Sequence, residues 1–223
     1  MAHDQASAIC IGNKLIACKT NQQLVERIMT KIIFFDLDGT LRQTKSGKTF
    51  INEPDDQQPL EGTQKALAYY QEKGFLLIGI TNQGGVAAGH KSLQSAIEEQ
   101  RITLQLFPEL SEIFFCPNWG ESCYQMSYDN VPLEFGAPIA GNGAKISCRK
   151  PGHGMLAVAA HSMADLNDCW MIGDRPEDQQ CAEAAGVKFV WASMMHAKFA
   201  GPGLQKIDCQ HIEADILMQF LAL

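Results

Sequence analysis

The chain has 223 residues, of which 46% are hydrophobic and 19% are charged, an ordinary composition for one globular core. Its net charge of −7 and pI near 5.3 argue against general attraction to nucleic acid or to anionic membranes. No apolar run reaches the roughly 18 residues that a membrane span needs, so we expect a soluble, cytoplasmic protein without a membrane partner. Eight cysteines in a chain of this size favour reduced thiols over a disulfide framework.

Apolar segments and helical segments alternate from residue 31 onward. The first 30 residues show no clear pattern and are expected to form an N-terminal extension. We expect strands at 32–36, 75–81, 112–116, 169–174 and 187–192, and helices at 62–74, 92–107, 154–163, 176–186 and 211–222. Apolar strands separated by helices indicate an α/β fold with a doubly wound, mostly parallel sheet. One domain is expected over 31–223, with an inserted, irregular loop at about 116–148.

Carboxylates follow the expected strands at their carboxyl ends, where sheets of this kind bind ligands. Asp36 and Asp38 come at the end of the first strand, and a spacing of two places both on the same side. Asp174 ends a later strand and brings a third carboxylate to the same edge. Three carboxylates without an opposing buried base imply a hard divalent cation, most simply Mg2+ with several waters.

A hydroxyl and an amine are expected at the same edge of the sheet. Thr81 ends the strand "LLIGIT", and Lys150 precedes the helix expected at 154–163. Facing a metal-bound carboxylate cluster, these two groups could bind the peripheral oxygens of a phosphoryl group. One of the aspartates could then attack phosphorus.

Four motifs stand in the order found in one superfamily of phosphotransferases. They are "DLDGTL" at 36–41, "TNQGG" at 81–85, "CRKPGHGM" at 148–155 and "GDRPEDQQCAEAAG" at 173–186. Over about residues 31–200 the chain resembles the haloacid dehalogenase (HAD) superfamily, subclass III, which implies a Rossmann-like core. The motifs "TNQ" and "RKP" are most similar to the branch of histidinol-phosphate phosphatase and heptose bisphosphate phosphatase, with polynucleotide 3′-phosphatases as more distant relatives.

The resemblance implies a catalytic role for four residues. Asp36 would be the nucleophile and would form an aspartyl-phosphate. Asp38 would protonate the leaving oxygen and then deprotonate the attacking water. Thr81 and Lys150 would stabilise the phosphoryl group during its transfer.

The resemblance also implies metal ligands and substrate contacts. Asn82 and Arg149 are candidate substrate contacts, Arg149 because a guanidinium suits a second phosphate or a carboxylate. The residues implied in Mg2+ binding are Asp36, Asp38 through its backbone carbonyl, and Asp174, with Asp178 supporting the coordination without binding the metal directly.

The cysteines depart from the pattern of the heptose phosphatase group, in which a Cys-x-His pair and a Cys-x-Cys pair bind structural zinc. Asn118 stands where the histidine would fall, and Ser147 precedes Cys148 in place of a Cys-x-Cys pair. Cys116, Cys123 and Cys148 leave three thiolates without an obvious fourth ligand. We predict that zinc is lost, and an altered zinc site on these three cysteines is the alternative.

Two intervals bear on access to the site. The interval from Asp38 to Thr81 is short and mostly filled by one expected helix, which leaves little room for a large cap domain and predicts an open site. The loop at 116–148 is long enough to cover the site and select the substrate. Its aromatic residues either stack on a base or sugar or pack the loop onto the body; they are Trp119, Tyr124, Tyr128 and Phe135.

Three functions compete on this evidence. The leading interpretation is a Mg2+-dependent phosphomonoesterase, working as a monomer on a small phosphorylated metabolite such as a sugar phosphate. A polynucleotide 3′-phosphatase is the alternative, although the acidic balance and the single basic residue of 116–148, Lys145, count against it. A phosphate-binding domain without turnover is disfavoured, because every catalytic position holds a competent residue.

Overall fold

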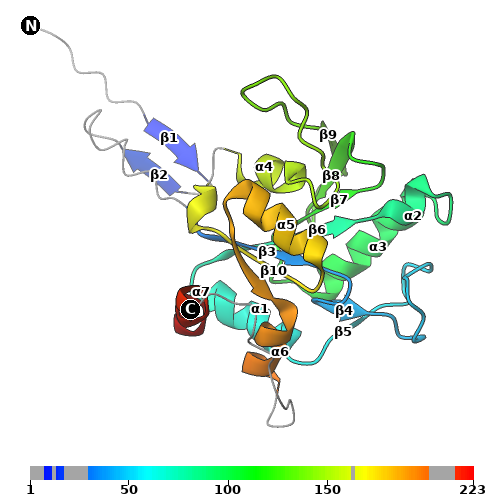
Figure 1. Cartoon of the computed structure of the whole chain (residues 1–223), viewed down its shortest axis with the longest axis horizontal. Coiled ribbons are helices and arrows are strands. Elements are labelled where there is room, and N and C mark those ends of the chain that lie inside the picture. Colours follow the sequence, from blue (N-terminus) through cyan, green and yellow to red (C-terminus); the bar gives the residue numbers. More distant parts are fainter. Residues whose placement is uncertain (1–7, 12–13, 18–29, 162–163, 201–213) are drawn as a thin grey trace, which may run out of the picture.

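A seven-stranded sheet organises the part of the chain that the computed structural model describes, which is residues 8–11, 14–17, 30–161, 164–200 and 214–223. The strand order is β11-β10-β3-β6-β7-β8-β9 (Figure 1). The first five strands in that order are parallel and the last two are antiparallel. The parallel strands are β3 (Ile32–Asp36), β6 (Leu76–Asn82), β7 (Glu112–Cys116), β10 (Trp170–Gly173) and β11 (Lys188–Trp191). The predicted α/β fold with a doubly wound, mostly parallel sheet is confirmed.

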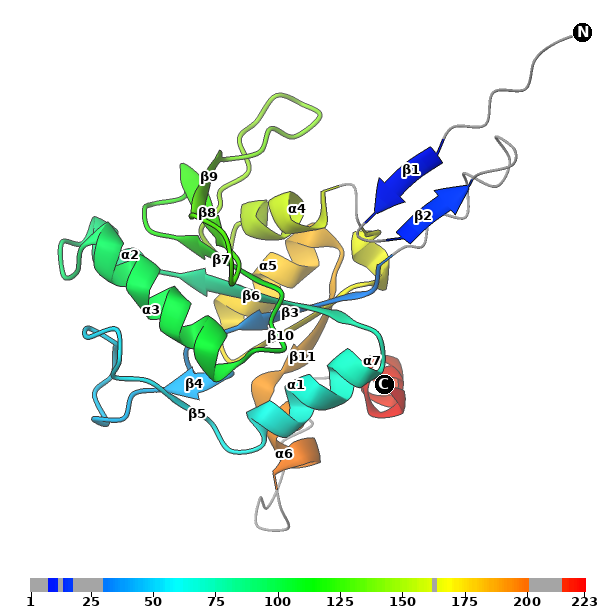
Figure 2. The same cartoon turned by 180° about the vertical axis from the view of Figure 1, so that it is seen from behind.

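Helices cover both faces of the sheet, as the two opposite views show (Figures 1 and 2). Alternate residues of β3 point to opposite faces, so Ile33 and Phe35 join one hydrophobic cluster while Ile32 and Phe34 join the other. The first cluster also takes residues from α1 (Thr63–Glu72), α3 (Leu93–Leu106), α6 (Ala192–Phe199) and α7 (Ala214–Ala222). The second takes residues from α4 (Gly154–Ala160) and α5 (Pro176–Ala185). Burial on both faces explains why the strand sequences are apolar without alternation.

The segment 116–148 is not the irregular loop that we predicted. It contains β8 (Ser122–Met126) and β9 (Leu133–Gly136), which extend the main sheet in antiparallel order beyond β7. Tyr124 of β8 stacks on Phe115 of β7 with ring centroids 5.3 Å apart, so this aromatic packs the insertion onto the body. The prediction was wrong because both strands are short and lie between Gly, Pro and Asn residues, which mask a period of two.

The interval between Asp38 and Thr81 also holds more than the one helix expected. The strands β4 (Arg42–Gln43) and β5 (Gln58–Pro59) pair with each other, and the residues between them form an extended loop. No separate cap domain occurs among the described residues of this interval. The 44–57 loop, which joins β4 to β5, instead lies beside the carboxyl edge of the sheet (Figure 2).

Smaller differences concern the termini and the helix ends. Within the expected N-terminal extension, β1 (Ala8–Ile11) and β2 (Lys14–Ala17) form a hairpin. A short helix, α2 (Gly84–Ala87), occupies the Gly-rich turn, and α6 was not predicted.

Residues 162–163 and 211–213, the predicted ends of two helices, lie outside the described residues. The domain boundary at residue 30 stays a prediction. None of the helices described is long and apolar enough to cross a membrane.

Candidate active site

A cavity of about 890 Å3 lies at the carboxyl edge of the parallel strands. The residues proposed for chemistry come to this one place from segments far apart in the chain. Those that line it are Asp36, Asp38, Thr81, Asn82, Arg149, Lys150, Asp174 and Asp178. The edge predicted from the strand ends is therefore the one that carries the cavity, as expected for an open α/β sheet.

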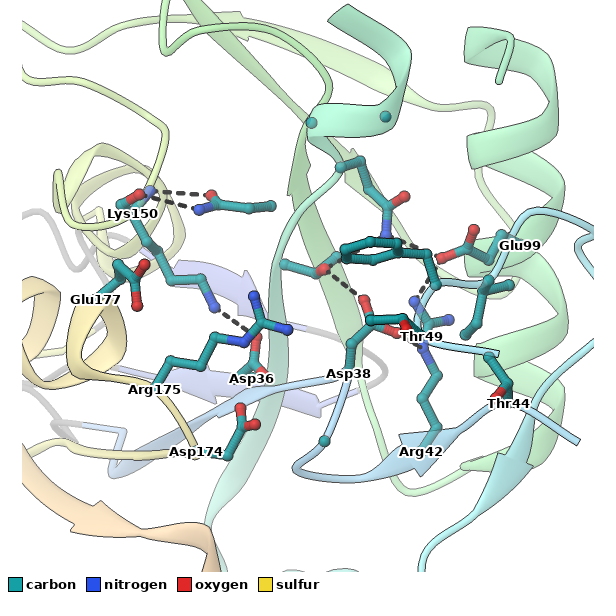
Figure 3. Close-up of a pocket in the computed structure, with 18 of the residues that line it drawn as sticks. Asp36, Asp38, Arg42, Thr44, Thr49, Glu99, Lys150, Asp174, Arg175 and Glu177 are labelled. Atoms are coloured by element: carbon teal, nitrogen blue, oxygen red, sulfur yellow. Dashed lines mark hydrogen bonds and ion pairs between the residues drawn. The ribbon is translucent and has the colours of Figure 1, made fainter. Parts of the chain in front are cut away.

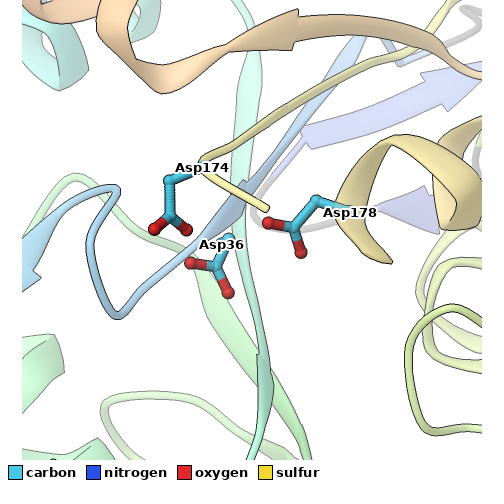
Figure 4. A group of neighbouring side chains, drawn as sticks. All are labelled: Asp36, Asp174 and Asp178. Atoms are coloured by element: carbon cyan, nitrogen blue, oxygen red, sulfur yellow. The ribbon is translucent and has the colours of Figure 1, made fainter. Parts of the chain in front are cut away.

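Three aspartates form the acidic centre of the cavity (Figure 4). Asp36 ends β3, Asp174 follows β10, and Asp178 lies in the first turn of α5. Each offers a carboxylate oxygen, and the three oxygens lie within 4.8 Å of one another. An all-carboxylate donor set of this kind fits a hard cation such as Mg2+.

The turn after β3 leaves room for this centre only because residue 39 is glycine. Gly39 has a φ of +91°, in the left-handed region that favours glycine. A Cβ atom at this position would collide with the carboxylate of Asp174. The glycine of "DLDGTL" therefore allows the first and third carboxylates to approach each other.

Lys150 forms ion pairs with two of the three carboxylates, those of Asp36 and Asp178. Its Nζ lies 2.5 Å from Oδ1 of Asp36 and 2.6 Å from Oδ1 of Asp178, and it also donates to the carbonyl of Ile80 at 3.2 Å. The Lys150 residue is 5% exposed. Burial opposes the charge of this ammonium, but Asp36 and Asp178 outweigh burial and raise its pKa. Lys150 therefore stays charged and holds Asp36 in place.

The Asp36 carboxyl has an unusual environment. Its other oxygen, Oδ2, is buried and has no hydrogen-bond partner. Burial, followed by the nearby charges of Asp178 and Asp38, raises the pKa of Asp36 to about 7, while Lys150 opposes this shift. Burial also raises the pKa of Asp174, and Asp178 adds to the shift. Such a carboxyl gains from a cation or another electrophile at its free oxygen.

We expect Mg2+ to bind more weakly as pH falls below about 7. The pKa of Asp36 in the folded protein lies above its ordinary value. The folded protein therefore loses stability as pH rises through about 7 and this carboxyl ionises, and a bound cation would offset that loss. Below that pH a proton must leave before the cation binds, which weakens affinity by up to about tenfold per pH unit. Calorimetric titration with Mg2+ at pH 6, 7 and 8 measures this change, and equal affinity at all three values would contradict it.

The loop that contains Lys150 is tied to the end of β6. Nδ2 of Asn82 donates to the carbonyl of Lys150 at 3.0 Å, and the amide of Lys150 donates to Oδ1 of Asn82 at 2.9 Å. Both polar atoms of this side chain thus bind the backbone of Lys150 and connect its loop to β6. A substrate contact by Asn82 stays a prediction.

Arg149 lies beside the cavity with part of its guanidinium free. Its guanidinium carbon is 5.4 Å from the ring centroid of Trp119, a cation–π contact. Nη1 is buried without a hydrogen-bond partner, and a Cβ atom at Gly84 would lie 2.7 Å from it. An unpaired guanidinium nitrogen is suited to an anionic ligand group.

Sequence reasoning missed a buried arginine on the other side of Asp38. Arg42 is fully buried and pairs with Asp38 and with Glu99 of α3 (Figure 3). Nothing in the residues around Arg42 marks it as internal. The available signal was on α3, where Glu99 and Thr103 occupy the helical face that also carries the buried Ala96.

The three cysteines of the predicted alternative zinc site are fully buried and are not among the residues that line the cavity. The thiol of Cys116 donates to Oδ1 of Asn118 at 3.3 Å. Burial raises the pKa of Cys116 to about 11, which favours the neutral thiol. Among the described residues the three sulfur atoms do not form a group within metal-sharing distance, whereas the three aspartates do. Whether zinc binds here stays a prediction.

Comparison with known families identifies the family of the chain. Residues 31–203 match the family model described as polynucleotide kinase 3 phosphatase. The chain belongs to this family of HAD phosphatases. The predicted membership of the superfamily, made on the four motifs, is confirmed.

The relatives of this HAD phosphatase include sugar-phosphate enzymes. The D-glycero-beta-D-manno-heptose-1,7-bisphosphate 7-phosphatase of Haemophilus ducreyi is 34% identical over 169 residues, which cover 71% of this chain and 80% of that protein. The enzyme of the same name from Pasteurella multocida is 30% identical over 170 residues, covering 72% and 79%. The D,D-heptose 1,7-bisphosphate phosphatase of B. bronchiseptica, solved with magnesium and phosphate, has a TM-score of 0.53 at 22% identity, covering 86% of this chain and 99% of that one.

Proposed function

We propose that this HAD phosphatase is a Mg2+-dependent phosphomonoester hydrolase that forms an aspartyl-phosphate on Asp36 and acts on a small sugar-phosphate-like metabolite. The observation that carries the proposal is the free Oδ2 of Asp36. This oxygen is buried without a partner, while Lys150 holds Oδ1 at 2.5 Å. An oriented carboxylate with one unpaired oxygen at the edge of a cavity is suited to attack phosphorus.

Two displacements complete the proposed reaction. In the first, Oδ2 of Asp36 bonds to phosphorus while the ester P–O bond breaks, and Asp38, which begins this step protonated, gives its proton to the departing oxygen. In the second, Asp38 takes a proton from a water molecule, whose oxygen bonds to phosphorus and releases the Asp36 carboxylate with inorganic phosphate. Asp38 is thereby ready for the next turnover.

Lys150 and Thr81 would support the transferring group in different ways. The three acceptors of Lys150 are Asp36, Asp178 and a backbone carbonyl, so this side chain acts on the phosphoryl oxygens through its positive charge. The hydroxyl of Thr81 donates to Oδ2 of Asp38 at 3.4 Å, and it would turn to donate to a phosphoryl oxygen when the substrate binds.

The acidic centre would hold the metal. When bound, Mg2+ would neutralise the charge of the phosphoryl oxygens during transfer. The proposed ligands are the carboxylates of Asp36 and Asp174 and the backbone carbonyl of Asp38. Asp178 would orient them, since its Oδ2 accepts from the amide of Arg175 at 3.0 Å and its Oδ1 pairs with Lys150.

The relatives and the cavity support a phosphorylated sugar as substrate. The curated relatives at 30% identity or more include heptose bisphosphate phosphatases. Arg149 lines the cavity and its Nη1 has no hydrogen-bond partner, so its guanidinium would bind a second phosphate or a carboxylate of the substrate. A monomeric state and a cytoplasmic location stay predictions.

A 3′-phosphorylated oligonucleotide is the second candidate substrate. The family model that matches the chain is described by that activity, and two exposed aromatics line the cavity. Phe50 is 65% exposed and Trp119 is 64% exposed, and bases stack on such side chains. The net charge of −7 and the relatives favour the sugar phosphate.

Phosphate release by the purified protein tests the proposal. The panel contains sugar mono- and bisphosphates, histidinol phosphate, nucleotides and a 3′-phosphorylated oligonucleotide, each with and without Mg2+. We expect Mg2+-dependent turnover that is fastest on a sugar phosphate, and a loss of roughly 100-fold on bisphosphates in Arg149→Met, with a smaller loss on monophosphates. Turnover of the oligonucleotide alone, falling steeply with salt, would select the second candidate. Silence across the panel would contradict both.

A further inference from the structure

We propose that Arg42 is a positioning residue for Asp38, fixing one carboxylate oxygen so that the other meets the ester oxygen of the substrate. The inference rests on the proposed function, in which Asp38 moves protons to and from the reacting group. Arg42 directly follows "DLDGTL" and lies outside all four motifs.

The contact between Arg42 and Asp38 lies at the edge of the cavity (Figure 3). Nε of Arg42 donates to Oδ1 of Asp38 at 3.0 Å. The arginine side chain is 0% exposed, whereas the aspartate side chain is 40% exposed. The pair is therefore shielded from water on the arginine side and open on the aspartate side. Oδ2 of Asp38 accepts only a long hydrogen bond, 3.4 Å from the hydroxyl of Thr81, among the described residues, and it is the oxygen that would exchange a proton with the substrate.

The rest of the guanidinium is bound by protein. Nη1 donates to Oε1 of Gln57 at 3.0 Å and to the hydroxyl of Thr103, and Nη2 donates to Oε1 of Glu99 at 2.6 Å. Since the side chain has no exposed surface, it offers no face to a ligand. Arg42 thus acts on the reaction through Asp38 and does not bind the substrate.

Glu99 holds the guanidinium of Arg42 at Nη2, whereas Asp38 binds it at Nε. It is 1% exposed and comes from α3, a different element from the turn that carries Asp38. Its Oε1 also accepts from Nε2 of Gln83 at 2.9 Å, and its Oε2 pairs with Lys91. The carboxylate of Glu99 and these hydrogen bonds hold the buried guanidinium of Arg42 in one arrangement.

A fixed Asp38 matters most when the leaving group is a poor one. An alkoxide needs a proton as the P–O bond breaks, whereas p-nitrophenolate leaves without one. Misplacing a catalytic group by about 1 Å costs on the order of 100-fold in rate. Loss of the positioning contact should therefore slow alkyl esters far more than activated aryl esters.

The test compares two substrates in Arg42→Lys. We expect kcat/KM to fall about 100-fold on glycerol phosphate and no more than about fivefold on p-nitrophenyl phosphate. Because kcat/KM reports steps up to the first irreversible one, it isolates formation of the aspartyl-phosphate. Glu99→Gln keeps the size of the side chain but removes the charge that holds Arg42. It should change the ratio of the two kcat/KM values in the same direction, and it replaces Arg42→Lys as the test variant if that protein does not fold.

Leu104→Ala is the matched control, because Leu104 is a buried residue of the same helix as Glu99 and lies outside the cavity. It should destabilise the protein and leave the ratio of the two kcat/KM values unchanged. An unchanged ratio in the folded Arg42 and Glu99 variants would overturn the positioning role while the proposed function stands. A wild-type protein that hydrolyses neither of these esters nor any sugar phosphate would overturn both.

Discussion

Asp36→Asn is expected to lower phosphate release by about 10^4-fold or more, because an amide cannot form the proposed bond to phosphorus. The protein should remain folded. Burial raises the pKa of Asp36 to about 7, so the ionised carboxyl costs stability above that pH, and a neutral side chain of the same shape removes this cost. Thermal unfolding at pH 8 without Mg2+ should therefore show a midpoint equal to or above that of the wild type.

The matched control for this substitution is Asp129→Asn. Asp129 is exposed in the turn between β8 and β9 and lies outside the cavity. The Asp129→Asn substitution makes the same change of charge as Asp36→Asn, and the protein should keep full activity. An Asp36→Asn protein as active as this control would remove Asp36 from the role of nucleophile.

Lys150→Met is expected to cost both stability and activity. At pH 8 it leaves the buried carboxylates of Asp36 and Asp178 without their shared cation, a loss of about 3–5 kcal/mol in the free energy of unfolding. At pH 6 the loss should be smaller, because the raised pKa of Asp36 lets that carboxyl take up a proton. Phosphate release should fall by about 10^2- to 10^3-fold, since a charge beside the phosphoryl group is lost.

Urea unfolding at both pH values, with and without Mg2+, measures the stability change. Saturating Mg2+ should restore part of the loss at pH 8, because the cation would supply the missing positive charge. Lys145→Met, at an exposed position of the insertion, is the control and should behave as the wild type does. Equal losses at pH 6 and pH 8 would show that Lys150 contributes packing and not charge.

The sequence was informative where one physical effect dominates. The run "IIFFD" is apolar on both faces because β3 is buried on both faces, and this pattern identifies a central parallel strand. The carboxyl ends of such strands share one edge, so Asp36, Thr81 and Asp174 could be placed together before their distances were known.

Features that depend on distant contacts could not be read in this way. Arg42 follows a turn and resembles a surface residue until Glu99, 57 positions later, is packed against it. The strands β8 and β9 are recognisable only through their pairing, β8 with β7 and β9 with β8, because their own residues mix polar and apolar types. The double contact of Asn82 with the Lys150 backbone spans 68 positions and leaves no local pattern.

The antiparallel end of the sheet has a consequence for how the chain can diversify. The amide of Cys148 donates to the carbonyl of Gly120 at 3.0 Å, so the last residue of the insertion is tied to its beginning, next to Trp119 at the cavity. The turn at 127–132 lies beyond this tie and outside the cavity lining. Evolution can lengthen or shorten that turn, and an engineer can splice a reporter into it, while Trp119 keeps its place beside Arg149.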